Sequence, residues 1–352
     1  IAGCTSLILA GFGLKDSIKD VTDFQFNNII KYDKLLMTNE SINQIDIEKE
    51  LLNDDKVENF TNVNTQNIKV LFNDEEQEVT MITPDDFNSI SKSISLIDLK
   101  TNNVIDNISD NSCIISEKTA KLLDIDVGDK ISLLDNDNNK YDIKVSYIIK
   151  NYINQYLYIN KNTYNNLFNN YKINSILISL KDKDKNSKEF DKKYISNGYA
   201  LTIVDNDDMK NSMNDMLSSI DSIVAILIIA AASLAFVVLY NLSNINISER
   251  KREIATLKVL GFYPSEVDKY INRETVLLTI LGIGIGLLFG SYLSHFIIST
   301  CEPDYIMFDR HVYTLSYFYS LFITVIFTII VTIVTHFNLK KINMVTSLKN
   351  VE

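Results

Sequence analysis

The chain has 352 residues, 46% of them hydrophobic, and a formal net charge of −11. This length allows two or three structural units, and the acidic balance without a basic patch argues against nucleic-acid binding. Cys4, Cys113 and Cys301 lie far apart and form no CxxC pair. We therefore expect neither a zinc site nor a disulfide framework.

The chain opens with an apolar stretch over residues 1–14 that is too short to span a bilayer. We interpret residues 1–34 as the end of a truncated first membrane helix that continues as a stalk, because Ile18, Val21 and Ile29 recur at helical spacing. An ordinary core helix of the soluble domain is the alternative for the stalk. A lipobox at Cys4 is disfavoured, because the apolar residues continue after the cysteine instead of preceding it.

Residues 35–205 have the pattern of an α+β domain. Segments rich in β-branched and aromatic residues predict strands at 68–72, 78–83, 112–115, 130–134, 141–149, 156–159 and 176–180. Helices are expected at 41–52, 116–123, 162–169 and 187–195. Between two of the strands, residues 135–139 form an Asp/Asn turn. The acidic runs 182–184 and 205–208 lack the glycine and distal glutamate of an EF-hand, so we expect solvated turns and no metal site.

Three uncharged apolar runs follow, at residues 223–242, 276–298 and 317–337, and each is long enough to cross a bilayer. Gly282, Gly286 and Gly290 recur every four residues in the second run and therefore share one helix face. A nucleotide-binding glycine motif needs a strand before it, and here the surroundings are wholly apolar. We interpret the three glycines as a helix-packing stripe.

Basic residues set the predicted topology, because cytoplasmic loops of membrane proteins carry an excess of lysine and arginine. Such residues flank the membrane runs in the connection 244–269 and in the tail 338–352, so both are assigned to the cytoplasm. Domain 35–205 and loop 300–315 then lie outside. The predicted fold is a bundle of four transmembrane helices, the first truncated, with an inserted α+β domain on helical stalks. The remaining segments are the second stalk and membrane helix at 206–243 and the membrane helices at 270–299 and 316–337.

Sequence signatures of catalysis are absent. The chain has no GxxxxGK[ST], HExxH or GxSxG motif. We therefore predict no catalytic residue, no metal ligand and no cofactor, and we expect any energy source to be another subunit. The membrane helices also lack the interior charges that mark proton and ion pathways.

The charge-dense connection between the second and third membrane helices carries the most information. Ser248 can cap a helix, Leu257 and Leu260 extend its apolar edge, Gly261 is a natural stop, and Pro264 begins a second short helix. Such an amphipathic segment can lie on anionic lipid or dock into the groove of a partner. These residues alone favour neither alternative.

Several stretches resemble the FtsX-like permease family of ABC transporters. The sequence ERKREIATLKVLGFYPSEVDKYINRETVLLTILGIGIGLLFG is similar to that family's cytoplasmic connection and third membrane helix, and the ending INMVTSLKNVE is similar to its usual ending. SEKTAKLLDIDVGDKISL resembles the extracellular domain of MacB-type members. AGCTSLILAGFGLKDSI resembles the first helix of the repeat in long permeases that carry two such units, so the chain is expected to be the C-terminal repeat.

The resemblance implies a type VII exporter fold and a separate cytoplasmic ABC ATPase, with no catalysis by the permease itself. It also implies a second permease unit, as a homodimer or as the other half of the same chain, in a bacterial cell membrane. The task would be mechanotransmission for export, extrusion or peptide-antibiotic resistance. The alternative is a membrane-anchored extracellular sensor or scaffold without ATP coupling. The residues implied to couple the ATPase are Glu249, Arg250, Arg252, Glu253, Leu257, Leu260 and Gly261.

Overall fold

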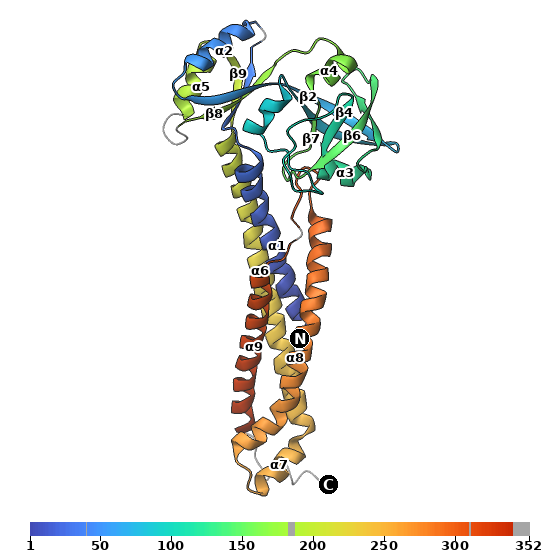
Figure 1. The fold of residues 1–352 in the computed structure, drawn as a ribbon. Helices are drawn as coiled ribbons and strands as arrows, with labels where there is room; N and C mark the ends of the chain where they lie inside the picture. Colours follow the sequence, from blue (N-terminus) through green and yellow to red (C-terminus); the bar gives the residue numbers. More distant parts are fainter. Residues whose placement is uncertain (40, 182–186, 310, 341–352) are drawn as a thin grey trace. The chain divides into compact units, whose positions relative to one another are not determined.

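A computed structural model of the chain describes residues 1–39, 41–181, 187–309 and 311–340. The chain divides into two compact units, and each is described by itself (Figure 1). The helical unit consists of Ile1–Lys19, Leu217–Cys301 and the described part of Arg310–Glu352. The sheet unit consists of Asp20–Met216 and Glu302–Asp309.

The helical unit is a bundle of four long helices and one short one. Its long helices are α1 (Ala2–Phe24), α6 (Asn206–Glu249), α8 (Pro264–Cys301) and α9 (Thr314–Lys340), and the short one is α7 (Lys251–Val259). The ends of α1 and α6 that lie near the sheet belong to the sheet unit. In the described part of the chain, three segments are long and apolar enough to cross a membrane: Asn206–Leu242, Val276–Thr300 and Thr314–Val334.

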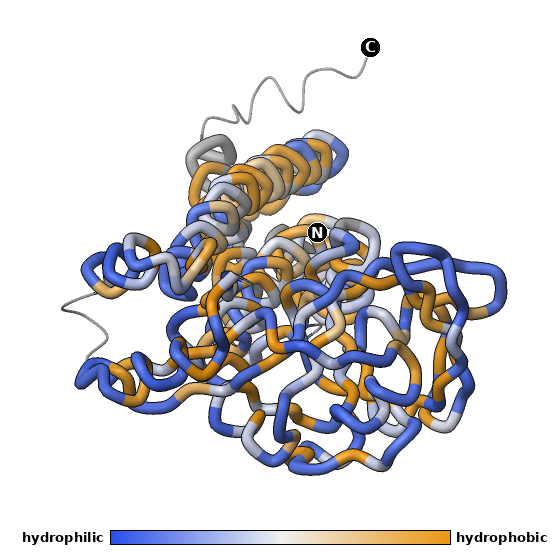
Figure 2. The backbone as a smooth tube through the Cα atoms, turned by 90° about the horizontal axis from the view of Figure 1, so that it is seen from above, coloured by the Kyte–Doolittle hydropathy of each residue, from blue (hydrophilic) through white to orange (hydrophobic). Residues whose placement is uncertain are grey.

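Burial differs sharply between α1 and the other long helices. Ile8, Leu9 and Ala10 of α1 are buried, whereas Ile229 of α6, Leu288 of α8 and Phe318 of α9 are exposed. The hydropathy colouring in Figure 2 shows long hydrophobic runs along the helices. Exposed apolar side chains on α6, α8 and α9 are what a helix surface in hydrocarbon requires, and α1 supplies the interior of the bundle.

The sheet unit is built on nine described strands. They are β1 (Lys34–Thr38), β2 (Val57–Phe72), β3 (Glu75–Pro84), β4 (Ser112–Ser116), β5 (Lys130–Leu134), β6 (Lys140–Ile149), β7 (Tyr156–Tyr158), β8 (Ser175–Leu180) and β9 (Ala200–Asp205). Their order is β3-β7-β4-β6-β5-β2-β8-β1-β9, and β3 also pairs with β2. This additional pairing closes six strands into a barrel and leaves β8, β1 and β9 as an open extension.

Strand β2 belongs to both parts of the sheet. Its first residues pair with β8, and its later residues pair with β3 on one side and with β5 on the other. The barrel core includes Val70, Leu133 and Val145. A second core, where Leu36 and Ile178 lie, is covered by α2 (Gln44–Asn53) and α5 (Ser187–Ser196). The remaining short helices are α3 (Glu117–Leu123), α4 (Lys161–Phe168), η1 (Gln25–Ile29) and η2 (Phe87–Lys92).

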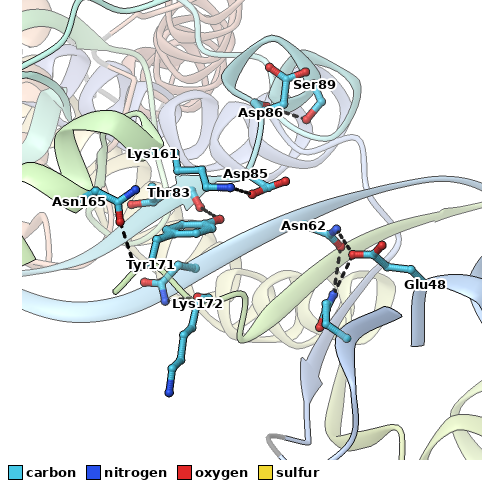
Figure 3. Close-up of polar contacts among 12 residues, drawn as sticks. Glu48, Asn62, Thr83, Asp85, Asp86, Ser89, Lys161, Asn165, Tyr171 and Lys172 are labelled. Carbon is cyan, nitrogen blue, oxygen red and sulfur yellow. Dashed lines mark hydrogen bonds and ion pairs between the residues drawn. The ribbon is translucent and has the colours of Figure 1, made fainter. Parts of the chain in front are cut away.

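Polar contacts attach the helices to the strands (Figure 3). The Glu48 carboxylate of α2 accepts a hydrogen bond of 2.7 Å from the Asn62 side chain of β2. Near the end of β3, the Tyr171 hydroxyl donates to the Thr83 carbonyl at 3.0 Å, and the Lys161 ammonium lies 5.0 Å from the centre of the Tyr171 ring. These contacts add to the apolar packing that holds α2 and α4 against the strands.

Most predicted elements of the α+β domain are confirmed. All four predicted helices and all seven predicted strands are present, with ends shifted by at most three residues except in β2. The Asp/Asn turn at 135–139 is present, with Asn138 at a φ of 61° and the Asp135 carboxylate accepting from two backbone N–H groups.

The structure also differs from the sequence interpretation. Strands β1 and β9 were not predicted, and β2 has 16 residues where only 68–72 were expected. The first half of β2 is polar, so its strand conformation comes from pairing with β8. The helix expected to begin separately at Pro264 is the first part of α8.

The acidic run at 205–208 lies at the N-terminus of α6 and supplies its cap. The Asp205 carboxylate accepts from the backbone N–H of Asp207 at 2.9 Å, as a helix cap does. Its other oxygen accepts from the Lys34 ammonium at 2.7 Å. The run at 182–184 lies outside the described residues.

Lys34 is a buried cation at the base of the open extension. Its side chain is only 1% exposed, and its ammonium lies 2.8 Å from Asp191 and 2.7 Å from Asp205. Because Asp191 is on α5 and Asp205 is at the end of β9, the cation joins both elements to β1.

We predict that Lys34→Met destabilises the open extension, because it leaves two carboxylates facing each other without their shared cation. The expected loss is about 2 kcal/mol, below the value for a fully buried pair since both carboxylates are partly exposed. Amide hydrogen exchange of β1, β8 and β9 in the full chain measures the loss. Lys69→Met, which breaks the exposed Lys69–Glu76 pair in the barrel, is the control and leaves exchange unchanged. Equal effects of the two changes would contradict the role assigned to Lys34.

Candidate functional site

The segment between α6 and α8 forms a short helix and a tight turn. Gly261 follows α7 with a φ of 90°, in the left-handed region that favours glycine. The Phe262 N–H donates to the Leu257 carbonyl at 3.1 Å, and the Leu260 N–H donates to the Thr256 carbonyl at 3.0 Å. The bond from Phe262 back to Leu257 is that of a Schellman stop, as expected for a glycine at this position.

Helix α8 begins immediately after this turn. Pro264 occupies its first position, where the missing N–H costs no helical hydrogen bond. The Glu266 carboxylate accepts from the backbone N–H of Tyr263 at 2.9 Å, which is one half of a capping box. The helix therefore has a cap even though its N-cap residue, Tyr263, is neither Ser nor Asp.

Apolar residues at the end of α7 and in the turn that follows it are exposed to solvent. We call this apolar patch the exposed turn. It consists of Val259, Leu260, Phe262 and Tyr263, of which Leu260 is 70% and Tyr263 72% exposed. By contrast, Ile254 of α7 is buried. Helix α7 is thus held by one face and displays apolar side chains at its end.

The predicted coupling residues lie between the last residue of α6 and the turn after α7. Glu249 and Glu253 are exposed, and Arg250 and Leu257 are partly buried. The side chain of Arg252 is not among those described. Phe262 and Tyr263 were not selected from the sequence, although an aromatic pair directly after a helix-stopping glycine is a signal that could have identified them.

The predicted glycine stripe of α8 faces α1. A Cβ added at Gly286 would lie 2.7 Å from the Ala2 carbonyl oxygen and 2.7 Å from Thr5 Cβ. At Gly282 it would lie 2.7 Å from Ile1, and at Gly290 3.0 Å from Leu9. The stripe therefore lies in the contact between the two helices and allows their backbones to approach closely.

Hydroxyl groups line the inner face of α9. The side chains of Ser320, Thr324 and Thr328 are buried, and each donates to the carbonyl four residues earlier at 2.8–2.9 Å. The Thr324 and Thr5 hydroxyls lie 3.3 Å apart. The Asp16 carboxylate of α1 accepts from the Tyr313 N–H at 3.1 Å, just before α9 begins. These polar groups are satisfied within the bundle, as a membrane interior requires.

The described side chains give no evidence of a metal-binding site or of a nucleophile for covalent catalysis. Within the described ranges, no group of three or more His, Cys, Asp or Glu residues could hold a metal ion. Cys4 and Cys113 are free and buried, and burial raises the pKa of the Cys113 thiol well above its usual range. Cys113 is therefore a protonated core residue of β4 and not a nucleophile.

Comparison with known families matches residues 225–344 to the FtsX-like permease C-terminal family. The chain contains an FtsX-like permease domain. Members of this family are transporter components and not themselves catalysts. The matched region includes α7, the exposed turn and the glycine stripe, so the features singled out above belong to the permease domain.

Solved structures give low similarity. The extracellular domain of the noncanonic ABC-type transporter YknZ from Gram-positive bacteria is 14% identical, with a TM-score of 0.34, over 49% of this chain and 97% of that one. The periplasmic region of MacB from Actinobacillus actinomycetemcomitans is 14% identical, with a TM-score of 0.34, over 52% of this chain and 92% of that one. No curated protein matches the chain.

We predict different effects on stability for Gly286→Ala and Gly284→Ala in the permease domain. The Cβ at position 286 meets the α1 backbone, whereas the Cβ at position 284 meets no atom within 4 Å. Gly286→Ala should therefore destabilise the bundle by about 1–3 kcal/mol, and Gly284→Ala should be neutral or slightly stabilising through helix propensity. Thermal unfolding in detergent measures both. Equal melting temperatures would show that the stripe does not hold α1.

Proposed function

We propose that this chain is the permease subunit of an ATP-binding cassette transporter and transmits movement driven by a separate cytoplasmic ATPase to its sheet unit. The observation that carries the proposal is the exposed turn. Apolar side chains protrude there from a charged link between two membrane-span helices, inside an FtsX-like permease domain. Exposed apolar side chains grouped at one end of a helix are typical of a protein-binding surface.

The chemistry of this surface suits an ATPase groove. Leu260, Phe262 and Tyr263 serve as apolar anchors, and aromatic anchors contribute strongly to protein interfaces. We assign the charged residues of the same link, Glu249, Arg250, Arg252 and Glu253, the role of orienting the docked partner. Gly261 fixes the turn that displays the anchors. The buried Ile254 keeps α7 attached to its own chain, so that pressure on the turn moves the membrane helices.

The membrane arrangement follows from the same proposal. Helix α1 is the fourth span in this proposal, and the glycine contact with α8 supports its place in the bundle. The positively charged link lies in the cytoplasm, and the sheet unit lies outside a bacterial cell membrane. A second permease unit, from another copy or from the other half of a longer chain, completes the transporter.

The first test of the proposal is Leu260→Asp, which places a charge at the centre of the exposed turn. The loss of an apolar anchor costs about 2 kcal/mol or more, so association with the partner ABC ATPase should fall about 30-fold. Leu52→Asp is a matched control, because Leu52 is equally exposed (74%) but lies on α2. Copurification of the co-expressed subunits in detergent measures the association. Retention of the ATPase by Leu260→Asp would favour a sensor or scaffold without ATP coupling.

The second test concerns topology. In intact cells, a membrane-impermeant maleimide should label Asn138→Cys at the tip of the β5–β6 hairpin but not Ser248→Cys near the end of α6. Both positions are exposed in the structure, so access depends on the membrane alone. Permeabilised cells, in which both variants should react, provide the control. Labelling of Ser248→Cys from outside would reverse the proposed orientation.

A further inference from the structure

The short segment Glu302–Asp309 belongs to the sheet unit, although the residues before and after it belong to the helical unit. Glu302 follows directly on Cys301, the last residue of α8. Ile306, Met307 and Phe308 are buried. The segment is thus part of the packed structure of the sheet unit and not a free loop.

Backbone hydrogen bonds attach the segment to residues 151–155. The Asn154 N–H donates to the Tyr305 carbonyl at 2.7 Å, and the Met307 N–H donates to the Tyr152 carbonyl at 2.8 Å. Ile153 and Ile306 are partners in an antiparallel bridge between these two bonds. The segment therefore adds to the sheet unit as a very short strand.

Buried side chains complete the attachment. Lys118 of α3 and Glu302 form an ion pair of 3.6 Å, with side chains only 9% and 4% exposed. The Glu302 carboxylate also accepts from the Phe308 N–H at 2.9 Å, and the Gln155 amide donates to the Asp304 carbonyl at 2.8 Å. Removing the segment would expose apolar side chains and leave a buried lysine without its carboxylate, which is strongly unfavourable.

The same residues 151–155 also receive the end of α1. Gln25, in the π-helix η1 that continues α1, donates to the Asn151 side chain at 2.9 Å and accepts from the Tyr152 N–H at 2.9 Å. The Asn151 amide donates in turn to the carbonyls of Ile153 and Asn154 at 2.8 and 2.7 Å. Gln25 and Asn151 are buried. We call residues 151–155 the hub, because two segments that lead to membrane helices meet there.

We propose that movement of α8 is transmitted to the sheet unit at the hub. The Glu302–Asp309 segment carries this movement and remains bound to the hub throughout the transport cycle. Lys118 and Glu302 are the positioning residues that keep the segment attached to the sheet unit. Because Glu302 follows α8 without a linker, displacement of the end of that helix must either move the hub or break these contacts. This inference rests on the proposed function and adds a route besides α1 and α6.

The test is amide hydrogen exchange of the hub in the complex of the full chain with its ATPase, without nucleotide and with ATP plus vanadate. The wild type should show a nucleotide-dependent change at residues 151–155. Glu302→Gln keeps a hydrogen-bond acceptor for Phe308 but removes the charge that faces Lys118, and should reduce this change several-fold while the ATPase stays bound. Glu76→Gln is the matched control, because its pair with Lys69 is exposed. A wild-type hub without a nucleotide-dependent change, or an undiminished change in Glu302→Gln, overturns the proposal.

A second variant tests whether the Glu302–Asp309 segment remains bound to the hub. Ile153 and Ile306 are a non-hydrogen-bonded antiparallel pair, and such positions have Cα atoms roughly 4.5 Å apart, within the range for a disulfide. Ile153→Cys with Ile306→Cys, in a Cys301→Ser background, should form a disulfide in membranes and keep ATP turnover. If the disulfide abolishes ATP turnover and reduction restores it, the segment must detach from the hub during the cycle, which contradicts the proposal. If the wild type binds no ATPase, the proposed function is wrong. The disulfide yield still measures, independently of the ATPase, whether the Glu302–Asp309 segment is bound to the hub.

Discussion

The close approach of α1 and α8 is the constraint on which the helical unit depends. Lipid tails are as apolar as leucine, so helices in a bilayer gain little from hydrophobic burial and associate through tight packing. Gly282, Gly286 and Gly290 allow that packing, since each lies where a Cβ would press against α1. With α1 held in this way, its hydroxyl groups can meet those of α9, and Asp16 can bind the start of that helix.

The sheet unit depends instead on one long strand and on buried polar groups. Strand β2 serves two cores, so the barrel and the open extension share a backbone ladder and cannot move as independent parts. At the places where the chain enters and leaves this unit, polar groups replace apolar packing: Lys34 holds the end of β9, and Gln25 holds the hub. Buried polar contacts specify geometry more narrowly than apolar contacts do, because an unmade hydrogen bond is costly. This suits segments that must transmit movement without slipping.

The proposed mechanism joins these features and assigns ATP hydrolysis to a separate subunit. Gly261 and the Glu266 cap present an apolar turn at one end of the permease domain, and the Glu302–Asp309 segment leads from α8 into the sheet unit. Between them lies α8, an unbroken helix of 38 residues. A continuous helix is a stiff element, so it is well suited to carry displacement from one end to the other.

The sequence by itself determined the local features: apolar runs, the glycine stripe, the stop at Gly261, the Asp/Asn turn, and most helices and strands of the sheet unit. Each of these depends on residues close in sequence, whose periodicity or backbone preference is visible directly. Tertiary structure alone decided the polar half of β2, the edge strand β9, the ion pairs of Lys34 and Lys118, and the hub. Those depend on partners more than 80 residues away, such as Glu302 for Lys118 and Asn151 for Gln25, and no local pattern encodes such pairings.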